Sequence, residues 1–196
     1  GSGKTTVGRK VASLLGWRFV DLDSEIARET GKSVEVIFAE MGELYFRQLE
    51  SDCLKKISIG KHQVISTGGG VVVEKLNRDI MHQNGVVICL EAGPETIYRR
   101  LKDQIKGNDP VVRPMLIDPN PMERICSLKG GRQFSYASAD WTVHTDKMTP
   151  GEVAGEIIRA WRRITDNKLS SGSQDEKDLA AVVRTSSRNY PVWVGW

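Results

Sequence analysis

The pattern of apolar and polar positions predicts a chain in which short strands alternate with amphipathic helices. Apolar residues recur at helical spacing over 7–15, and Gly16 ends that run. An unbroken apolar stretch at 86–90 is typical of a parallel strand that is buried on both faces. Further strands are expected at 18–21, 63–66 and 141–145.

Helices are expected between and after these strands. Asp23 or Ser24 can cap a helix that ends at Gly31, and Ser33 can cap the next one, through 41. The other predicted helices span 43–57, 94–101, 122–128 and 151–164. Residues 106–121 are rich in Pro, Gly, Asn and Asp and are predicted to form a loop. Because strands alternate with helices, the predicted fold class is α/β, a parallel sheet with helices on both faces.

Composition indicates a chain that folds around a packed core. Its 196 residues are 39% hydrophobic and 27% charged, which suits one good-sized domain plus an appendage. The net charge of +3 is too small to indicate nucleic acid as a partner. No apolar run approaches the roughly 18 residues of a membrane span. Three widely separated cysteines are typical of a reducing compartment, so the expected location is the cytoplasm.

The chain begins with part of a phosphate-binding motif. Its first residues are Gly1, Ser2, Gly3, Lys4, Thr5 and Thr6. They match the closing positions of the pattern G-x-x-x-x-G-K-[ST], in which backbone N–H groups and a helix N-terminus bind phosphate oxygens. Lys4 would reach the terminal phosphates of a nucleotide, and the Thr5 hydroxyl would be a Mg²⁺ ligand. A flexible Gly-Ser segment is the alternative, which the helical pattern over 7–15 disfavours.

Two carboxylates follow the strand predicted at 18–21. Asp21 and Asp23 lie at the carboxyl end of that strand, the edge at which open α/β sheets bind ligands. Two residues apart on extended chain, they would point in roughly the same direction. One could bind Mg²⁺ through water while the other orients or deprotonates a substrate hydroxyl. The alternative is a strand-end acid and a helix cap that bind no ligand.

Two arginines are candidates for binding a substrate carboxylate. Arg47 lies in Phe46-Arg47-x-x-Glu50 on a predicted helix, where Glu50 can hold its guanidinium. Arg132 lies in R-x-x-x-Y together with Tyr136. The guanidinium fork suits a carboxylate. For each arginine, the alternative is an ordinary surface position.

Two further elements could approach a ligand closely. Gly68, Gly69 and Gly70 follow the strand predicted at 63–66 and let backbone N–H groups approach a ligand; a plain tight turn is the alternative. Arg113 lies in the predicted loop, where an arginine on a closing lid can neutralise a transferring phosphoryl group. A solvated loop arginine is the alternative there.

Taken together, these segments resemble shikimate kinases. The matching segments are GSGKTTVGR, DLDSEI, GKSVEVIFAEMGELYFRQLE, STGGGVV, VICLEAGPE, RPML and ADWTVHTD, within residues 1–164. The resemblance implies a P-loop fold similar to nucleoside monophosphate kinases and ATP-dependent phosphorylation of the 3-hydroxyl of shikimate. A kinase for gluconate or another small hydroxy acid, and a nucleotide-binding module without catalysis, are the alternatives.

The resemblance also implies roles for individual residues. Lys4 and Arg113 would stabilise the phosphates, and Arg100 would border the adenine. Asp23 would bind the shikimate hydroxyls and act as base. Mg²⁺ would be held by Thr5 and, through water, by Asp21. Contacts to ATP are implied for Gly1, Ser2, Gly3, Lys4, Thr5 and Thr6, and contacts to shikimate for Asp23, Arg47, Gly68, Gly69, Gly70 and Arg132.

The C-terminal part of the chain differs in composition. Residues 165–178 are polar and Ser/Gly-rich and are expected to be a linker. Within 179–196, the stretch RTSSRNYPVWVGW is similar to the start of a 3-dehydroquinate synthase, which implies a kinase–synthase fusion. A disordered tail is the alternative.

The strand that precedes a phosphate-binding loop is absent before Gly1. In this fold that strand lies at the centre of the sheet, so its neighbours would lie roughly 10 Å apart, twice the normal spacing. Each unpaired backbone group at the gap would cost about 1–3 kcal/mol. The chain is therefore expected to be unstable and inactive.

Overall fold

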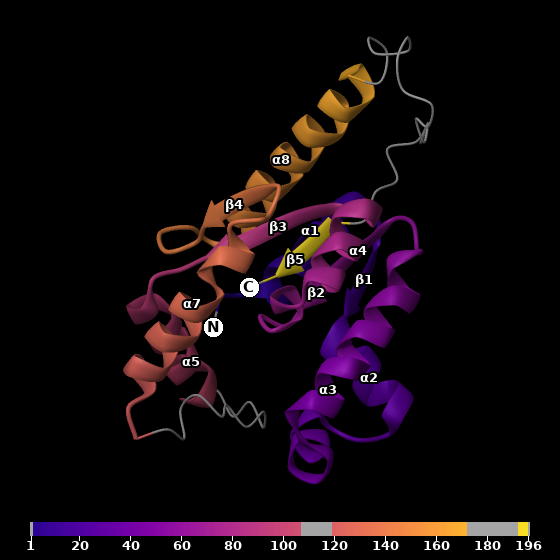
Figure 1. Ribbon diagram of the computed structural model, residues 1–196. Helices are drawn as coiled ribbons and strands as arrows, with labels where there is room; N and C mark the ends of the chain where they lie inside the picture. Colours follow the sequence, from indigo (N-terminus) through magenta and orange to yellow (C-terminus); the bar gives the residue numbers. More distant parts are fainter. Residues whose placement is uncertain (1, 107–118, 172–191, 196) are drawn as a thin grey trace.

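A parallel β-sheet with helices on both faces organises the residues that the structure describes (Figure 1). The computed structural model describes residues 2–106, 119–171 and 192–195. The strands are β1 (Arg18–Asp21), β2 (Gln63–Thr67), β3 (Val86–Glu91), β4 (Trp141–His144) and β5 (Val192–Gly195). Their order in the sheet is β1-β2-β5-β3-β4, and every ladder is parallel. The predicted α/β class is thus confirmed.

Two hydrophobic cores lie on the two faces of the sheet. The helices are α1 (Lys4–Leu15), α2 (Leu22–Thr30), α3 (Val34–Ser58), α4 (Lys75–Asn84), α5 (Pro94–Lys106), α7 (Pro121–Tyr136) and α8 (Pro150–Ser171), with a 3₁₀ turn, η1, at Val71–Val73. Residues of α1 and α8 pack on one face, and residues of the other helices form the core of the opposite face. Side chains alternate along β3, so Val86 and Ile88 belong to the α1–α8 core while Val87 and Cys89 belong to the other.

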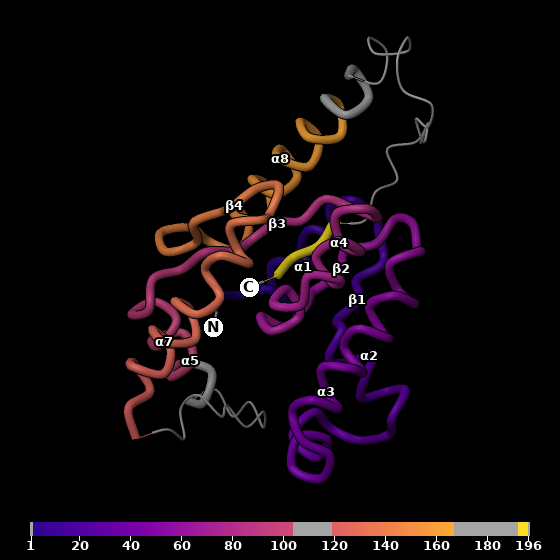
Figure 2. Tube along the Cα trace, in the orientation of Figure 1, coloured from indigo at the N-terminus to yellow at the C-terminus, as the bar shows by residue number. Residues whose placement is uncertain are grey.

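The helices that leave the sheet form two lobes. Figure 2 shows α2 and α3 on one side of the view and α5 and α7 on the other, below the sheet. None of the described helices is long and apolar enough to cross a membrane.

The first lobe is shaped by one cap and one glycine. Asp21 caps α2 by accepting a hydrogen bond from the Ser24 backbone N–H at 3.3 Å. The expectation that Asp23 or Ser24 would be the cap is wrong, because α2 begins directly after β1 and only Asp21 precedes it. Farther along, α3 bends at Gly42, where φ is 81° and ψ is 171°. The two helices predicted on either side of that position are the two arms of α3.

Two helices extend beyond their predicted ends. α7 runs from Pro121 to Tyr136 because burial of Ile125 and Tyr136 outweighs the low helix propensity of the glycines between them. α8 continues to Ser171, well into the segment 165–178 that was expected to be a linker. The chain offers no Gly or Pro after Gly155 that would end α8 before that point.

β5 lies at the centre of the sheet. Val192, Trp193 and Val194 each have 0% of their surface exposed. Along β2, Val64, Ile65, Ser66 and Thr67 pair with the four residues of β5, and 86–89 of β3 pair with them on the other side. Trp193 enters the core under α2 to α7, whereas Val192 and Val194 enter the α1–α8 core.

The expectation of an open gap at the centre of the sheet is therefore wrong. β2 and β3 both have a ladder partner, because 192–195 lie between them. Local sequence could not show this, since the segment pairs with strands more than a hundred positions away. Its carboxyl end is closely enclosed, because a Cβ at Gly195 would come within 2.7 Å of Thr67 Oγ1.

The stability of the chain should depend on Trp193. Replacing it by Ala leaves a large cavity in the central core, and we expect the free energy of unfolding to fall by about 3–5 kcal/mol. Urea unfolding followed by far-ultraviolet circular dichroism measures the change. Phe134→Ala is the control, because Phe134 is 87% exposed and its loss should cost no more than about 0.5 kcal/mol. Equal midpoints for wild type and Trp193→Ala would contradict a buried central β5.

Candidate functional site

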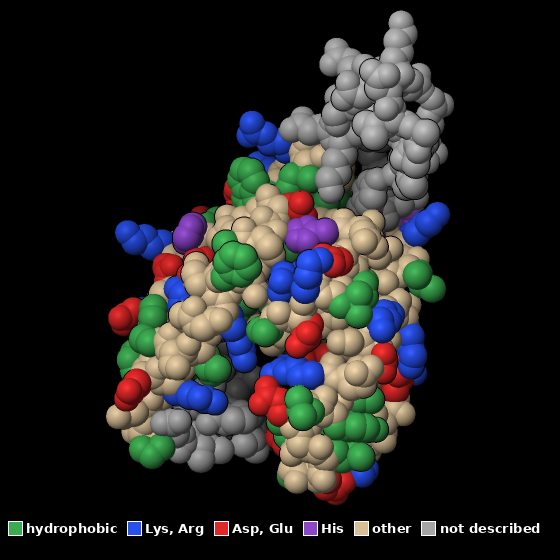
Figure 3. Space-filling view, in the orientation of Figure 1, with side chains coloured by type: hydrophobic (Ala, Val, Ile, Leu, Met, Phe, Trp, Pro, Cys, Tyr) green, Lys and Arg blue, Asp and Glu red, His purple; other side chains and the backbone are tan. Residues whose placement is uncertain are grey.

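The candidate site lies beyond the carboxyl ends of the parallel strands, where sheets of this class bind ligands. α1 begins at this edge, and the glycines after β2 and the acidic residues after β1 also lie there. Figure 3 shows a hollow between the α2–α3 lobe and the α5–α7 lobe, with Lys, Arg, Asp and Glu side chains around it.

The start of α1 is built to receive an anion. Gly3 is the N-cap and adopts a left-handed conformation with φ of 90°, which favours glycine. The first turn of the helix therefore presents its backbone N–H groups and the positive end of the helix dipole. Ser2 is buried, and its hydroxyl has no hydrogen-bond partner among the described residues. Gly1 lies outside the described residues.

The two predicted Mg²⁺ ligands lie together. The Thr5 hydroxyl donates to Asp21 Oδ2 at 3.2 Å. Both are oxygen donors of the kind that Mg²⁺ prefers, and a site of one or two protein oxygens is usual where substrate phosphates and water complete the shell. These residues therefore fit the predicted ion.

Asp23 is half-buried, and its Oδ1 atom is shielded from solvent. Burial and then the neighbouring Asp21 carboxylate raise the pKa of Asp23. Its Oδ1 has no hydrogen-bond partner among the described residues. A Cβ at Gly68 would lie 3.6 Å from this oxygen and 3.2 Å from Glu50 Oε1. Gly68 thus keeps open the space toward which both carboxyl groups point.

Arg47 is held by two carboxylates of its own helix. Its Nη1 donates to Glu50 Oε2 at 2.5 Å and its Nη2 to Glu43 Oε1 at 2.7 Å. The Glu50 side chain is 2% exposed, whereas the Glu43 side chain is 64% exposed. Burial raises the pKa of Glu50 to about 7, against the opposing effect of Arg47. A Cβ at Gly70 would overlap the Arg47 guanidinium in its present position, so glycine at 70 lets the guanidinium lie against the loop.

Arg132 faces Arg47 across the cleft. Arg132 on α7, Arg47 on α3 and Gly70 line a cleft with a volume of about 390 Å³. The cleft is also lined by Glu43, Leu44, Val73, Glu74, Ser127, Leu128 and Gly131. Two guanidinium groups that approach one space from separate helices suit a small carboxylate. The predicted pair of carboxylate-binding arginines therefore lies together in space.

Two predicted residues lie apart from this cleft or cannot be placed. Arg100 donates to the Thr145 carbonyl at 2.6 Å and to the Thr145 hydroxyl at 3.0 Å, so it joins α5 to the loop after β4. Arg113 lies outside the described residues.

Two residues of the cleft, and Lys129 on α7, had no predicted role. Glu43 anchors Arg47, and Leu44, 89% exposed, lines the cleft. Leu44 follows the polar Glu43 directly in the sequence, and this apolar residue beside a polar one was the signal that could have marked it as a cleft residue. Lys129 donates to the Ala92 carbonyl at 3.0 Å and also pairs with Glu91, which ties α7 to the end of β3.

Comparison with known proteins identifies the family. The shikimate kinase family matches residues 1–162. A shikimate kinase from Thermodesulfovibrio yellowstonii is 41% identical over 168 residues, which cover 86% of this chain and 94% of that protein. One from Caldanaerobacter subterraneus is 43% identical over 164 residues, 84% of this chain and 92% of the relative. A solved shikimate kinase from Acinetobacter baumannii in complex with shikimate superposes with a TM-score of 0.73 at 34% identity, over 86% of this chain and 89% of the other.

The buried Glu50 should make stability depend on pH. Between its ordinary pKa of 4.5 and the raised value of about 7, the folded chain keeps the proton that the unfolded chain has lost. Stability is therefore highest below the lower value and falls as pH rises through this window. Glu50→Gln mimics the protonated form. Its free energy of unfolding relative to that of wild type should therefore rise by about 2–3 kcal/mol when the pH is raised from about 4.5 to 8. Urea unfolding at both pH values measures the difference.

Glu43→Gln is the matched control, because Glu43 also pairs with Arg47 but is exposed. Its unfolding free energy should run parallel to that of wild type. If Glu50→Gln and wild type also show parallel pH curves, Glu50 is not the group that titrates.

Proposed function

Because the chain belongs to the shikimate kinase family, we propose that it transfers the γ-phosphoryl group of ATP to the 3-hydroxyl of shikimate. The products are shikimate 3-phosphate and ADP, in the route to chorismate and the aromatic amino acids. The observation that supports this most directly is the cleft that brings Arg47 and Arg132 together near the half-buried Asp23. A phosphate site at the start of α1 lies at the same edge of the sheet.

The ATP side of the site would be formed by the start of α1. Its backbone N–H groups would hold phosphate oxygens, and Lys4 would neutralise the charge that develops on the transferring group. Thr5 and Asp21 would hold Mg²⁺, which supplies positive charge at the phosphate oxygens when bound. From the resemblance, we also assign Arg113 to the transferring phosphoryl group and Arg100 to the adenine side.

The shikimate side would use one carboxylate and two arginines. Arg47 and Arg132 would bind the substrate carboxylate and so fix the ring. With the ring fixed, Asp23 would accept a hydrogen bond from the reacting hydroxyl and take its proton as the oxygen attacks phosphorus. The unpartnered Oδ1 of Asp23 and its raised pKa suit that role. Gly68, Gly69 and Gly70 would let the substrate approach the backbone.

We also infer the setting of the reaction. The composition supports a cytoplasmic enzyme, and the similarity of 184–196 to a 3-dehydroquinate synthase supports a covalent fusion with that enzyme. The fusion is tested by measuring the size of the native polypeptide in cell extract and by assaying it for synthase activity.

The proposal is tested by following ADP release with a panel of acceptors. Full chain with ATP and Mg²⁺ should release ADP on addition of shikimate, at a rate well above that with gluconate or quinate. Preference for gluconate would favour a kinase for another hydroxy acid. Nucleotide binding without turnover on any acceptor would favour a module without catalysis.

Arg47 should act on the acceptor and not on the nucleotide. Loss of a charge-assisted contact costs about 1.5–3 kcal/mol, so Arg47→Ala should raise the KM for shikimate about 10–100-fold. The KM for ATP should change less than about twofold, as expected for a residue that touches only the other substrate. Arg47→Lys keeps the charge without the fork and should fall between the two.

Arg28→Ala is the control for a lost arginine on the same lobe. Its side chain is 69% exposed and pairs with Glu25 on α2. Both KM values should stay at the wild-type level. Equal changes of the two KM values in Arg47→Ala would argue against a role in binding the acceptor.

A further inference from the structure

Tyr136 connects the two sides of the cleft through its hydroxyl. It is the last residue of α7 and lies one turn after Arg132, so the two side chains share a face of the helix. The Tyr136 hydroxyl donates to the Gly69 carbonyl at 3.2 Å, and the neighbouring Arg132 guanidinium opposes the rise that burial causes in the pKa of Tyr136. A phenol can donate one hydrogen bond and accept others, so a single oxygen joins α7 to the glycine loop after β2.

The glycine loop carries this connection to Arg47. Gly70 follows Gly69 directly, and the Arg47 guanidinium lies so close to it that a Cβ at Gly70 would overlap the charged group. Arg132 and Arg47 come from separate helices. Tyr136 and the glycine loop form the connection between these helices. Two guanidinium groups grip one carboxylate well only at a suitable separation and angle.

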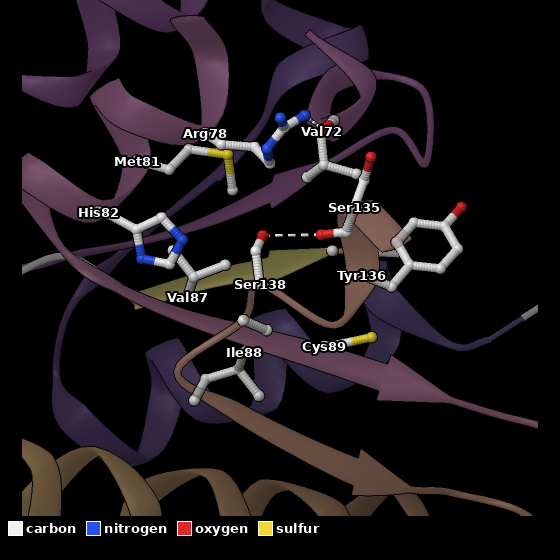
Figure 4. A pocket seen from close by; sticks show the side chains of 12 residues that line it. Val72, Arg78, Met81, His82, Val87, Ile88, Cys89, Ser135, Tyr136 and Ser138 are labelled. Carbon is white, nitrogen blue, oxygen red and sulfur yellow. Dashed lines mark hydrogen bonds between the residues drawn. The ribbon is translucent and has the colours of Figure 1, made fainter. Parts of the chain in front are cut away.

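The ring of Tyr136 is fixed by the core. The residue is 4% exposed and belongs to the core under α2 to α7. In Figure 4 the ring lies at one end of a small pocket, and its hydroxyl points away from the other residues that line it. That pocket has a volume of about 20 Å³ and is mostly apolar, with Met81, Val87 and Ile88 among its walls. Turning the hydroxyl into it would forfeit its hydrogen bond to the Gly69 carbonyl, so the core holds the oxygen toward the glycine loop.

We propose that Tyr136 is a positioning residue: by joining α7 to the glycine loop, its hydroxyl sets the separation of Arg132 on α7 from Arg47. The inference rests on the proposed function, because it assumes that the two arginines bind the carboxylate of the acceptor. In this proposal the hydroxyl of Tyr136 contributes to the affinity for the acceptor. The ring contributes to packing of the core.

Tyr136→Phe removes only the oxygen and keeps the ring. We expect the KM for shikimate to rise about tenfold, since leaving the Gly69 carbonyl without its donor costs about 1.5 kcal/mol. The kcat and the KM for ATP should change less than about twofold. Tyr98→Phe is the matched control, because Tyr98 packs against the same core from α5 and does not line the cleft. It should behave like wild type.

A second comparison separates positioning from a general structural effect. With a shikimate analogue in which a carboxamide replaces the carboxylate, Tyr136→Phe and wild type should bind about equally, as measured by calorimetry. On an Arg132→Ala background, the further substitution Tyr136→Phe should add little, because coupled residues are not additive. A tenfold loss that persists with the carboxamide, or a full additional loss on that background, would overturn the proposal. So would an unchanged shikimate KM.

Binding and turnover distinguish this inference from the proposed function. If wild type binds shikimate but releases no ADP, the proposed reaction fails, while weaker shikimate binding by Tyr136→Phe still supports the positioning role. If wild type binds no shikimate, both are overturned.

Discussion

The hydrogen-bond ladders on the two sides of β5 are the interaction on which the rest of the structure depends. β2 and β3 carry the residues that lead into the glycine loop and toward α5, and they can lie in one sheet only when a strand pairs with both. Val192, Trp193 and Val194 also enter the two opposite cores. The same four residues therefore connect the sheet laterally and join its two faces, which aligns the strand ends where the site forms.

Burial then decides the electrostatics of the site. Glu50 is buried and Asp23 is half-buried, and in each case desolvation is the largest influence on the pKa. A buried Glu50 holds Arg47 by a short ion pair, while the exposed Glu43 adds a second contact from the solvent side. Because the partners of Arg47 lie on its own helix, the guanidinium is in place before any substrate arrives, which reduces the ordering needed on binding.

The two arginines and the start of α1 are suited to different anionic groups, a carboxylate and a phosphate. Arg47 and Arg132 offer two guanidinium groups to a cleft that Glu43 and Glu74 also line, and the first turn of α1 offers backbone donors to phosphate. Asp23 lies near the arginine side with an unpartnered oxygen. Tyr136 and Gly69 link the separate helices that supply the arginines. Phosphoryl transfer depends mainly on positioning and charge neutralisation, and this arrangement provides both with few moving groups.

The sequence by itself determined the local elements and the chemistry of the candidate residues. Strand periodicity placed β1, β2, β3 and β4 well, and the spacing of Arg47 and Glu50 predicted the ion pair that they form, because these signals depend on neighbours within one or two turns. The tertiary structure alone decided the position of β5, the cap at Asp21, the bridge through Tyr136, the burial of Glu50 and the partial burial of Asp23. Strand pairing across more than a hundred residues and the loss of water around a carboxyl group are properties of packing. A local pattern carries no record of them, since the same residues in an exposed strand or helix would read the same way.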